Sequence, residues 1–281
     1  MTRLIRNAER HELSTIMDWA AAEGWNPGLD DAPAFWAADA EGYHVIEEDG
    51  VLVAAISLVR YRRRYGFLGF YIVRPEWRRQ GLGWALWQSV LDKASTPTIG
   101  LDGVVAQQEN YRKSGFVYAH ANYRYGGAPR SDLTAVSPDI IPIDAALIDR
   151  VAAYDIDFNP EPREKFIRAW VGHSNSREGL AFVQHGTVAG FGVIRACREG
   201  YKIGPLFAET DVIADQLFEA LAVRAGDRPV FLDIPGPNKA AQALCERHGM
   251  APVFETARMY RGPAPALPLD RIYGITTFEL G

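Results

Sequence analysis

A short segment in the first third of the chain has the composition of an anion-binding site. After an apolar run that ends at Val73, the chain reads Arg-Pro-Glu-Trp-Arg-Arg-Gln-Gly-Leu-Gly-Trp-Ala. Gly81 and Gly83 allow a tight turn and a close approach of the backbone to a ligand. A helix that starts there would present unpaired N–H groups and a partial positive charge, to which Arg78 and Arg79 add formal charge. The segment therefore predicts a site for a diphosphate group.

Two common nucleotide-binding motifs are excluded by the same residues. The glycines are not followed by Gly-Lys-Ser/Thr, which a phosphate-binding loop of nucleotide hydrolases needs. The third glycine of the dinucleotide fingerprint G-x-G-x-x-G is also missing. The remaining alternative is an ordinary glycine turn before a helix, with arginines that face water.

Hydrophobic periodicity places this segment between a strand and a helix, within a succession of elements that occurs twice. In the first half, strands are expected at 3–7, 43–47, 51–61, 66–73, 99–101 and 116–125, and helices at 9–22, 31–40, 83–94 and 107–114. In the second half, helices are expected at 144–154, 162–171, 212–225 and 239–247, and strands at 180–185, 187–196, 201–207, 230–233 and 252–260. A repeat of about 130 residues indicates a duplicated domain rather than a solenoid.

Turn-forming residues gather between the two halves. Residues 126–132 read Gly-Gly-Ala-Pro-Arg-Ser-Asp and show no apolar periodicity, which is typical of a linker. We therefore expect one domain at 1–127, a linker at 128–140 and a second domain at 141–281.

Composition narrows the class of protein. The 281 residues are 48% hydrophobic and carry a net charge of −5, which argues against a disordered chain and, weakly, against nucleic-acid binding. Two cysteines make no disulfide framework. We find neither a signal peptide nor an apolar run long enough for a membrane span, and the six histidines lack metal-ligand spacing. These features favour a cytoplasmic protein without a metal. They leave the oligomeric state, monomer or homodimer, undecided.

Three motifs in the first half resemble those of the GNAT superfamily of N-acetyltransferases. Residues 78–83 resemble its R/Q-x-x-G-x-G/A acyl-CoA loop, residues 73–76 its V-x-P-E approach, and residues 111–116 its Y-x-x-x-G-F segment. The resemblance implies an α+β (α/β) fold, in which each half has a mixed, mostly antiparallel central sheet flanked by helices. It also implies acetyl-CoA as the acyl donor, with direct transfer to a primary amine.

The resemblance assigns roles to individual residues. Tyr111 would protonate the departing thiolate, with a core aromatic as the alternative. The family's usual Asn, eleven residues before Gly115, is Val104 here, which removes one expected contact. The residues implied to bind the acyl-CoA are Ile72, Val73, Arg78, Arg79, Gln80, Gly81, Leu82, Gly83 and Trp84.

The second half resembles a degenerate copy of the same domain. After its central strand it reads Phe-Ala-Glu-Thr-Asp, without arginine or glycine, and its carboxylates at Glu209 and Asp211 would repel phosphates. We therefore expect that this half does not bind CoA.

The general base and the acceptor site are less defined. The strand 67–71 has no carboxylate where many family members place a Glu. Three candidates for the removal of the amine proton therefore remain, which are Asp102, a water relay and an acceptor amine that is already neutral. Asp102 could equally cap the following turn. By resemblance, the loop that holds Glu23, Trp25, Asp30 and Asp31 borders the acceptor pocket. Eleven acidic residues between 9 and 49 favour a cationic acceptor, although an aspartate there could instead cap the next helix.

Several alternatives to an acetyltransferase of small amines remain. The chain could bind or sense acyl-CoA without turnover, acetylate protein lysines, or use another activated donor such as an aminoacyl-tRNA. The sequence does not identify the acceptor or the acyl chain length. The tail, residues 271–280, has no role that the sequence assigns.

Overall fold

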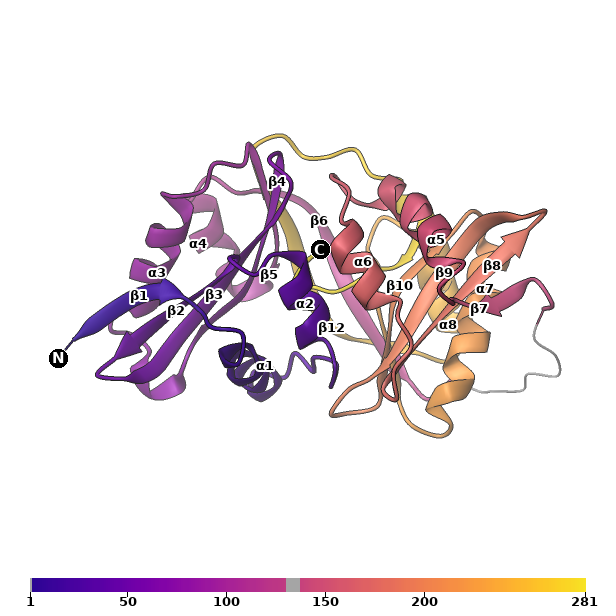
Figure 1. Ribbon diagram of the computed structural model, residues 1–281, viewed down its shortest axis with the longest axis horizontal. Helices are drawn as coiled ribbons and strands as arrows, with labels where there is room; N and C mark the ends of the chain where they lie inside the picture. The colour runs from indigo at the N-terminus through magenta and orange to yellow at the C-terminus, as the bar shows by residue number, and fades with distance from the viewer. Residues whose placement is uncertain (1, 130–136) are drawn as a thin grey trace.

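The computed structural model describes residues 2–129 and 137–281, which build a thirteen-stranded sheet covered by eight α-helices (Figure 1). The first half contributes β1 (Arg3–Asn7), α1 (Glu12–Ala22), α2 (Ala32–Ala38), β2 (Tyr43–Glu48), β3 (Val51–Tyr61), β4 (Tyr65–Val73), α3 (Leu82–Leu91), β5 (Thr98–Val104), α4 (Gln108–Lys113) and β6 (Val117–Gly127). The second half contributes β7 (Ile140–Pro142), α5 (Ile148–Asp155), α6 (Glu164–Trp170), β8 (Arg177–Gln184), β9 (Thr187–Ala196), β10 (Tyr201–Ala208), α7 (Asp211–Ala222), β11 (Val230–Pro235), α8 (Lys239–Arg247), β12 (Ala251–Arg261) and β13 (Ile272–Gly274).

The expected fold class and the repeated order of elements are confirmed. Every predicted helix and strand is present, with ends that differ by a few residues, whereas the short strands β7 and β13 were not predicted. Most of the predicted linker, residues 130–136, lies outside the described residues. The division of the chain at 127 and 141 stays a prediction.

The two halves exchange their last long strands. The sheet order is β1-β2-β3-β4-β5-β12-β6-β11-β10-β9-β8-β7, so β12 lies between β5 and β6, and β6 lies between β12 and β11. Both exchanged strands run antiparallel to their neighbours. The centre of the sheet is therefore built jointly, with β6 and β12 side by side between the two halves (Figure 1).

A buried ion pair fixes each exchanged strand in register. Arg258 of β12 lies opposite Asp102 of β5 and donates through Nε and Nη2 to its carboxylate at 2.6 and 2.7 Å. Arg124 of β6 lies opposite Asp233 of β11 and donates in the same way at 2.6 and 2.8 Å. Bidentate pairing adds geometric specificity to the attraction of the charges, so these repeat-equivalent pairs specify where each strand inserts.

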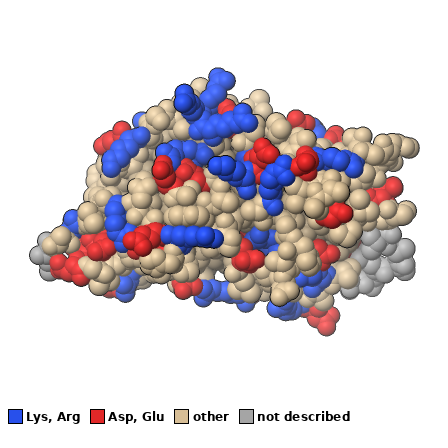
Figure 2. All heavy atoms as spheres, viewed as in Figure 1, with Lys and Arg blue, Asp and Glu red and all other residues tan. Residues whose placement is uncertain are grey.

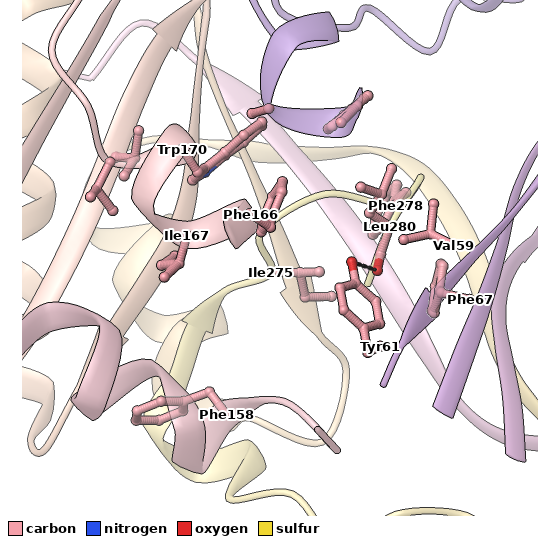
Figure 3. Close-up of a cluster of buried hydrophobic side chains, with 14 of the residues drawn as sticks. Val59, Tyr61, Phe67, Phe158, Phe166, Ile167, Trp170, Ile275, Phe278 and Leu280 are labelled. Carbon is pink, nitrogen blue, oxygen red and sulfur yellow. Dashed lines mark hydrogen bonds between the residues drawn. The ribbon is translucent and has the colours of Figure 1, made fainter. Parts of the chain in front are cut away.

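An aromatic core joins the halves on one side of the sheet. Phe35 of α2 stacks on Trp170 of α6 with ring centroids 5.7 Å apart. Figure 3 shows side chains of β3 and β4, of α6 and of the tail converging there, with the Tyr61 hydroxyl donating to the Leu280 carbonyl at 2.9 Å. The same cluster continues through α1, α2, α5 and α6, so burial of apolar surface couples the two halves.

The charged surface is mixed in sign. Figure 2 shows Lys and Arg side chains interspersed with Asp and Glu across the face that it views. The three consecutive arginines at 62–64 are exposed at the turn between β3 and β4. No helix among the described residues is both long and apolar enough to cross a membrane.

Lys202 is a buried ammonium group close to the junction of the halves. Its Nζ donates to the Trp25 carbonyl at 2.8 Å, and burial, followed by repulsion from Arg124, lowers its pKa to about 8 from 10.5. Because the folded pKa lies below the unfolded one, the unfolded chain binds more protons between pH 8 and 10.5, so this group adds stability as the pH rises through that window.

We expect the Lys202→Met variant to remove this pH dependence. The Trp25 carbonyl keeps a second donor, Arg124 Nη1 at 2.9 Å. The free energy of unfolding of the wild type, relative to the variant, should grow by about 1 kcal/mol between pH 8 and 9 and stay flat between pH 6 and 7. Urea unfolding of both proteins at the four pH values measures this, and a constant difference would contradict it.

Candidate acyl-transfer cleft

A cleft opens where two neighbouring strands of the first half diverge. β4 and β5 run parallel and pair only as far as Leu68 opposite Leu101. Beyond that point the pairing of β4 with β3 shifts register, and Phe70 adopts a φ of 47°. Such an irregularity bends the strand away from its partner, which separates β4 from β5 and exposes backbone groups of both.

The cleft has a volume of about 620 Å³ and collects most of the sequence-predicted site residues. The predicted residues that line it are Trp25, Ile72, Val73, Arg78, Arg79, Gly81, Leu82, Gly83, Trp84, Asp102 and Tyr111. Gln80, Asp30 and Asp31 do not belong to its lining. Val104, which replaces the family's usual Asn, lines it too.

The glycine loop forms the start of α3 at one wall of the cleft. Gly81 caps the helix at a φ of 79°, and no atom lies within 4 Å of where its Cβ would be, so the glycine is required by backbone conformation. A Cβ on Gly83 would lie 2.7 Å from the Tyr71 hydroxyl, so the second glycine allows α3 to pack closely on β4. No acidic side chain occupies the first turn, and the N–H groups there suit an anion.

The two arginines of the loop are held differently. Arg78 donates through Nε to the Val73 carbonyl at 2.8 Å and forms an ion pair with Glu23. Arg79, with a φ of 63°, has no acidic partner within 4 Å among residues 2–129 and 137–281. Gln80 is exposed, and its amide donates back to the Glu76 carbonyl at 3.4 Å. Arg79 is thus the guanidinium with the most freedom to meet a phosphate.

Tyr111 is both a packed aromatic and a cleft residue. Its ring stacks on Trp87 with centroids 5.5 Å apart, and a Cβ on Gly103 would lie 2.2 Å from Tyr111 Cε2. Burial, followed by repulsion from Tyr71, raises the pKa of Tyr111 to about 12. Its hydroxyl therefore stays protonated at neutral pH, as a proton donor must.

Asp102 lines the cleft but is engaged elsewhere. Its carboxylate accepts two hydrogen bonds from Arg258 and one from Asn122 Nδ2, which lies 2.7 Å from Oδ1. Three donors thus occupy the two oxygens of this carboxylate. The structure thus gives Asp102 a part in fixing β12, and this ion pair replaces the expected cap of the following turn.

Asp30 and Asp31 lie away from the cleft. Asp31 is buried between Arg177 and Arg195, with its carboxylate oxygens 3.1 Å from each guanidinium, and it accepts from the Gly28 N–H at 2.8 Å. The Asp30 carbonyl accepts from Arg177 at 2.5 Å. Asp31 directly precedes α2, but its side chain does not cap that helix. These aspartates join the halves, so they no longer support a cationic acceptor.

Residues distant in sequence complete the cleft, and sequence reasoning missed them. They are Arg124, Phe254 and Thr256 on the exchanged strands, and Phe278 and Glu279 on the tail. One signal in the sequence could have indicated the exchange. Arg124 follows Gly115 by nine residues, and Arg258 follows Gly249 by the same interval.

The equivalent opening in the second half is filled by the chain itself. β10 and β11 pair only from Tyr201 to Ile203 and then separate, and β13 pairs with β10 beyond that point. At the start of α7 the Thr210 hydroxyl accepts from the Ile213 N–H at 3.3 Å, and Asp211 occupies the first turn. These contacts argue against an acyl-CoA site there, in line with the expectation from the sequence.

Comparison with known proteins agrees with this architecture. The model of the acetyltransferase (GNAT) family matches residues 8–116, and that of an acetyltransferase (GNAT) domain matches residues 151–274. A holothin acyltransferase from Pseudoalteromonas sp. (strain SANK 73390) is 33% identical over 276 residues, which are 98% of this chain and 93% of that protein.

Solved structures share the fold over the whole chain. A protein from Pyrococcus horikoshii matches with a TM-score of 0.82 at 20% identity, over 99% of this chain and 96% of that one. A tandem GNAT protein from the clavulanic acid biosynthesis pathway matches with a TM-score of 0.65 at 14% identity, over 94% of this chain and 100% of that one.

Two GNAT folds fused in one chain define the tandem class of these acyltransferases. The chain belongs to the GNAT family and is a tandem N-acetyltransferase, as its motifs predicted. Its family reaction is acyl transfer to an amine.

Proposed function

We propose that the chain transfers an acetyl group from acetyl-CoA directly to the primary amine of a small molecule, within the cleft between β4 and β5. The observation that carries this proposal is the joint presence of the diverging strands, the glycine-capped start of α3 and Arg79 along one cleft. The pantetheine arm would lie along the exposed backbone of β4, and the diphosphate at the N–H groups of α3.

The walls of the cleft support a small acceptor with an apolar frame. Trp25, Phe254 and Phe278 line it together with Arg124, whose guanidinium lies 5.8 and 5.2 Å from the two Phe rings. The similar protein from Pseudoalteromonas is named as an acyltransferase of holothin. Because both halves and the tail border the cleft, we favour a small amine over the lysine of a folded protein.

A second candidate function is acyl-CoA sensing without turnover. It is favoured by the ion pair with Arg258, which occupies the Asp102 carboxylate that the sequence offered as a candidate base. Thermal denaturation with acetyl-CoA tests donor binding, since a ligand of the native state raises the melting temperature. Release of free thiol over a panel of primary amines then separates the enzyme from the sensor. Binding without thiol release from any amine would overturn the proposed reaction.

Reversing the charge of Arg79 should weaken donor binding. We expect the Arg79→Glu variant to raise the Kd for acetyl-CoA by about 10- to 100-fold, because one charge-assisted contact to phosphate is lost and a repulsion is added. The matched control is Lys165→Glu, the same charge change at an exposed site on α6. Calorimetric titration of both variants measures the Kd, and equal affinities would contradict the assignment.

A further inference from the structure

The tail that follows β13 runs from the second half into the first-half cleft. The Ile275 N–H donates to the Asp233 carbonyl at 2.6 Å, and Arg163 Nη2 donates to Thr276 Oγ1 at 2.9 Å. Further along, the Leu280 carbonyl accepts from Tyr61, and Leu280 is fully buried among the side chains of Figure 3. Anchors on both sides of Glu279 therefore fix the tail where it crosses the cleft.

Glu279 meets β4 at the position where that strand bends. A Cβ on Gly69 would lie 2.1 Å from the Glu279 carbonyl oxygen, so only a glycine in β4 lets the tail come this close. Glu279 is one of the residues that line the cleft. The tail thus brings a carboxylate to a stretch of β4, residues 67–71, that has none of its own.

Three carboxylates line the cleft, and within residues 2–129 and 137–281 only one of them is without an ion-pair partner. Glu23 is paired with Arg78, and Asp102 with Arg258. Glu279, although buried, has no basic group within 4 Å among the described residues. By elimination it is the cleft carboxylate that is available to an incoming amine.

The orientation of the Glu279 carboxylate is fixed by Thr277. The Thr277 hydroxyl accepts from the Glu279 N–H at 2.9 Å and donates its proton to Glu279 Oε2. A hydroxyl has a single proton to donate, so Oε1 receives nothing from Thr277. One oxygen is held in place, while the other has no hydrogen-bond partner in the part of the chain that the structure describes.

The charged groups around Glu279 come from several strands and already have partners. Arg124 is paired with Asp233, Arg195 with Asp31, and Lys202 donates to a carbonyl. The negative charge of Glu279 contributes to raising the pKa of each of these three groups, whereas burial, which is the largest single cause, lowers it. The carboxylate is thus near positive charge without being neutralised by direct contact.

We propose that Glu279 is the general base of the acyl transfer, a role that rests on the proposed function. The acceptor nitrogen attacks the thioester carbonyl carbon and forms the C–N bond, and Glu279 takes one proton from that nitrogen. The C–S bond breaks, its electron pair leaves with sulfur, and the Tyr111 hydroxyl protonates the thiolate. The proton on Glu279 returns to the Tyr111 phenolate through water, which restores both groups and leaves amide and free CoA.

The test compares Glu279→Gln with wild type, using acetyl-CoA with benzylamine, tryptamine and spermidine as acceptors. We expect kcat to fall by about 100-fold or more, the range of general-base catalysis, while the thermal shift with acetyl-CoA is unchanged. Glu279→Asp should keep part of the activity, and formate should partly restore the rate of Glu279→Ala. The control is Glu255→Gln, since Glu255 is exposed on β12 between two cleft residues.

Each outcome bears on one of the two proposals. A folded Glu279→Gln protein with wild-type kcat overturns the base and leaves the acetyltransferase intact. A raised KM at unchanged kcat also overturns it, because it shows an anchoring role. The base is supported by a kcat/KM that falls at low pH in wild type, as a carboxyl group is protonated, and does not show this fall in Glu279→Gln. No thiol release by wild type with any of the amines overturns the proposed function instead.

Discussion

Residues 1–127 expressed without the rest of the chain should fail to fold. The described partners of β6 are β11 and β12, both from the second half. Without them β6 has no strand beside it and β5 becomes an unprotected edge. Asp102 would also lose Arg258, and an uncompensated buried charge costs about 3–5 kcal/mol out of a typical total stability of about 5–15 kcal/mol.

Far-ultraviolet circular dichroism and size-exclusion chromatography of the fragment measure this outcome. Co-expression of residues 137–281 provides the control, because both exchanged strands are then available and the two fragments should copurify. A monomeric fragment that melts cooperatively and binds acetyl-CoA would contradict the expectation. That result would mean that β6 can fold back onto β5 within its own half.

The local elements of both halves could be predicted because each depends on nearby residues. Periodicity and turn chemistry placed α3 and its glycine cap, and the repeated succession of elements revealed the duplication. The exchange of β6 and β12 could not be predicted in this way. The two strands occupy the same position in each repeat, so their patterns fit either sheet, and the choice depends on contacts more than 100 residues apart in the chain.

The candidate site likewise combines residues that the local sequence predicts with residues that only long-range contacts bring together. The loop at 78–83 is read from consecutive residues, and the structure places most of it in the cleft. Asp31 and Glu279 show what such reading misses. Asp31 looked like an acceptor-pocket residue but meets two arginines of the second half, and Glu279 reaches the cleft only because the tail passes between the halves. Long-range burial, rather than local pattern, decides the role of a carboxylate here.

Replacing Tyr111 by Phe should lower kcat by about 100- to 1,000-fold, within the range of general-acid catalysis. The phenylalanine ring retains the packing on Trp87 and over Gly103, so the melting temperature and the Kd for acetyl-CoA should stay near those of wild type. Because burial raises the pKa of Tyr111 to about 12, its hydroxyl remains a donor across the working pH range. Ionisation of the Tyr111 hydroxyl should therefore not lower the kcat of wild type below about pH 11.

The leaving group separates proton donation from a packing role for Tyr111. A thioester of a more acidic thiol, such as thiophenol, needs less protonation as it departs, so the deficit of Tyr111→Phe should shrink with S-phenyl thioacetate compared with acetyl-CoA. Trp87→Phe offers a matched packing change at the same aromatic cluster, and its deficit should not depend on the thiol. An equal loss of kcat with both thioesters in Tyr111→Phe would make Tyr111 a positioning aromatic. The effect of losing a proton donor must instead depend on the basicity of the departing sulfur.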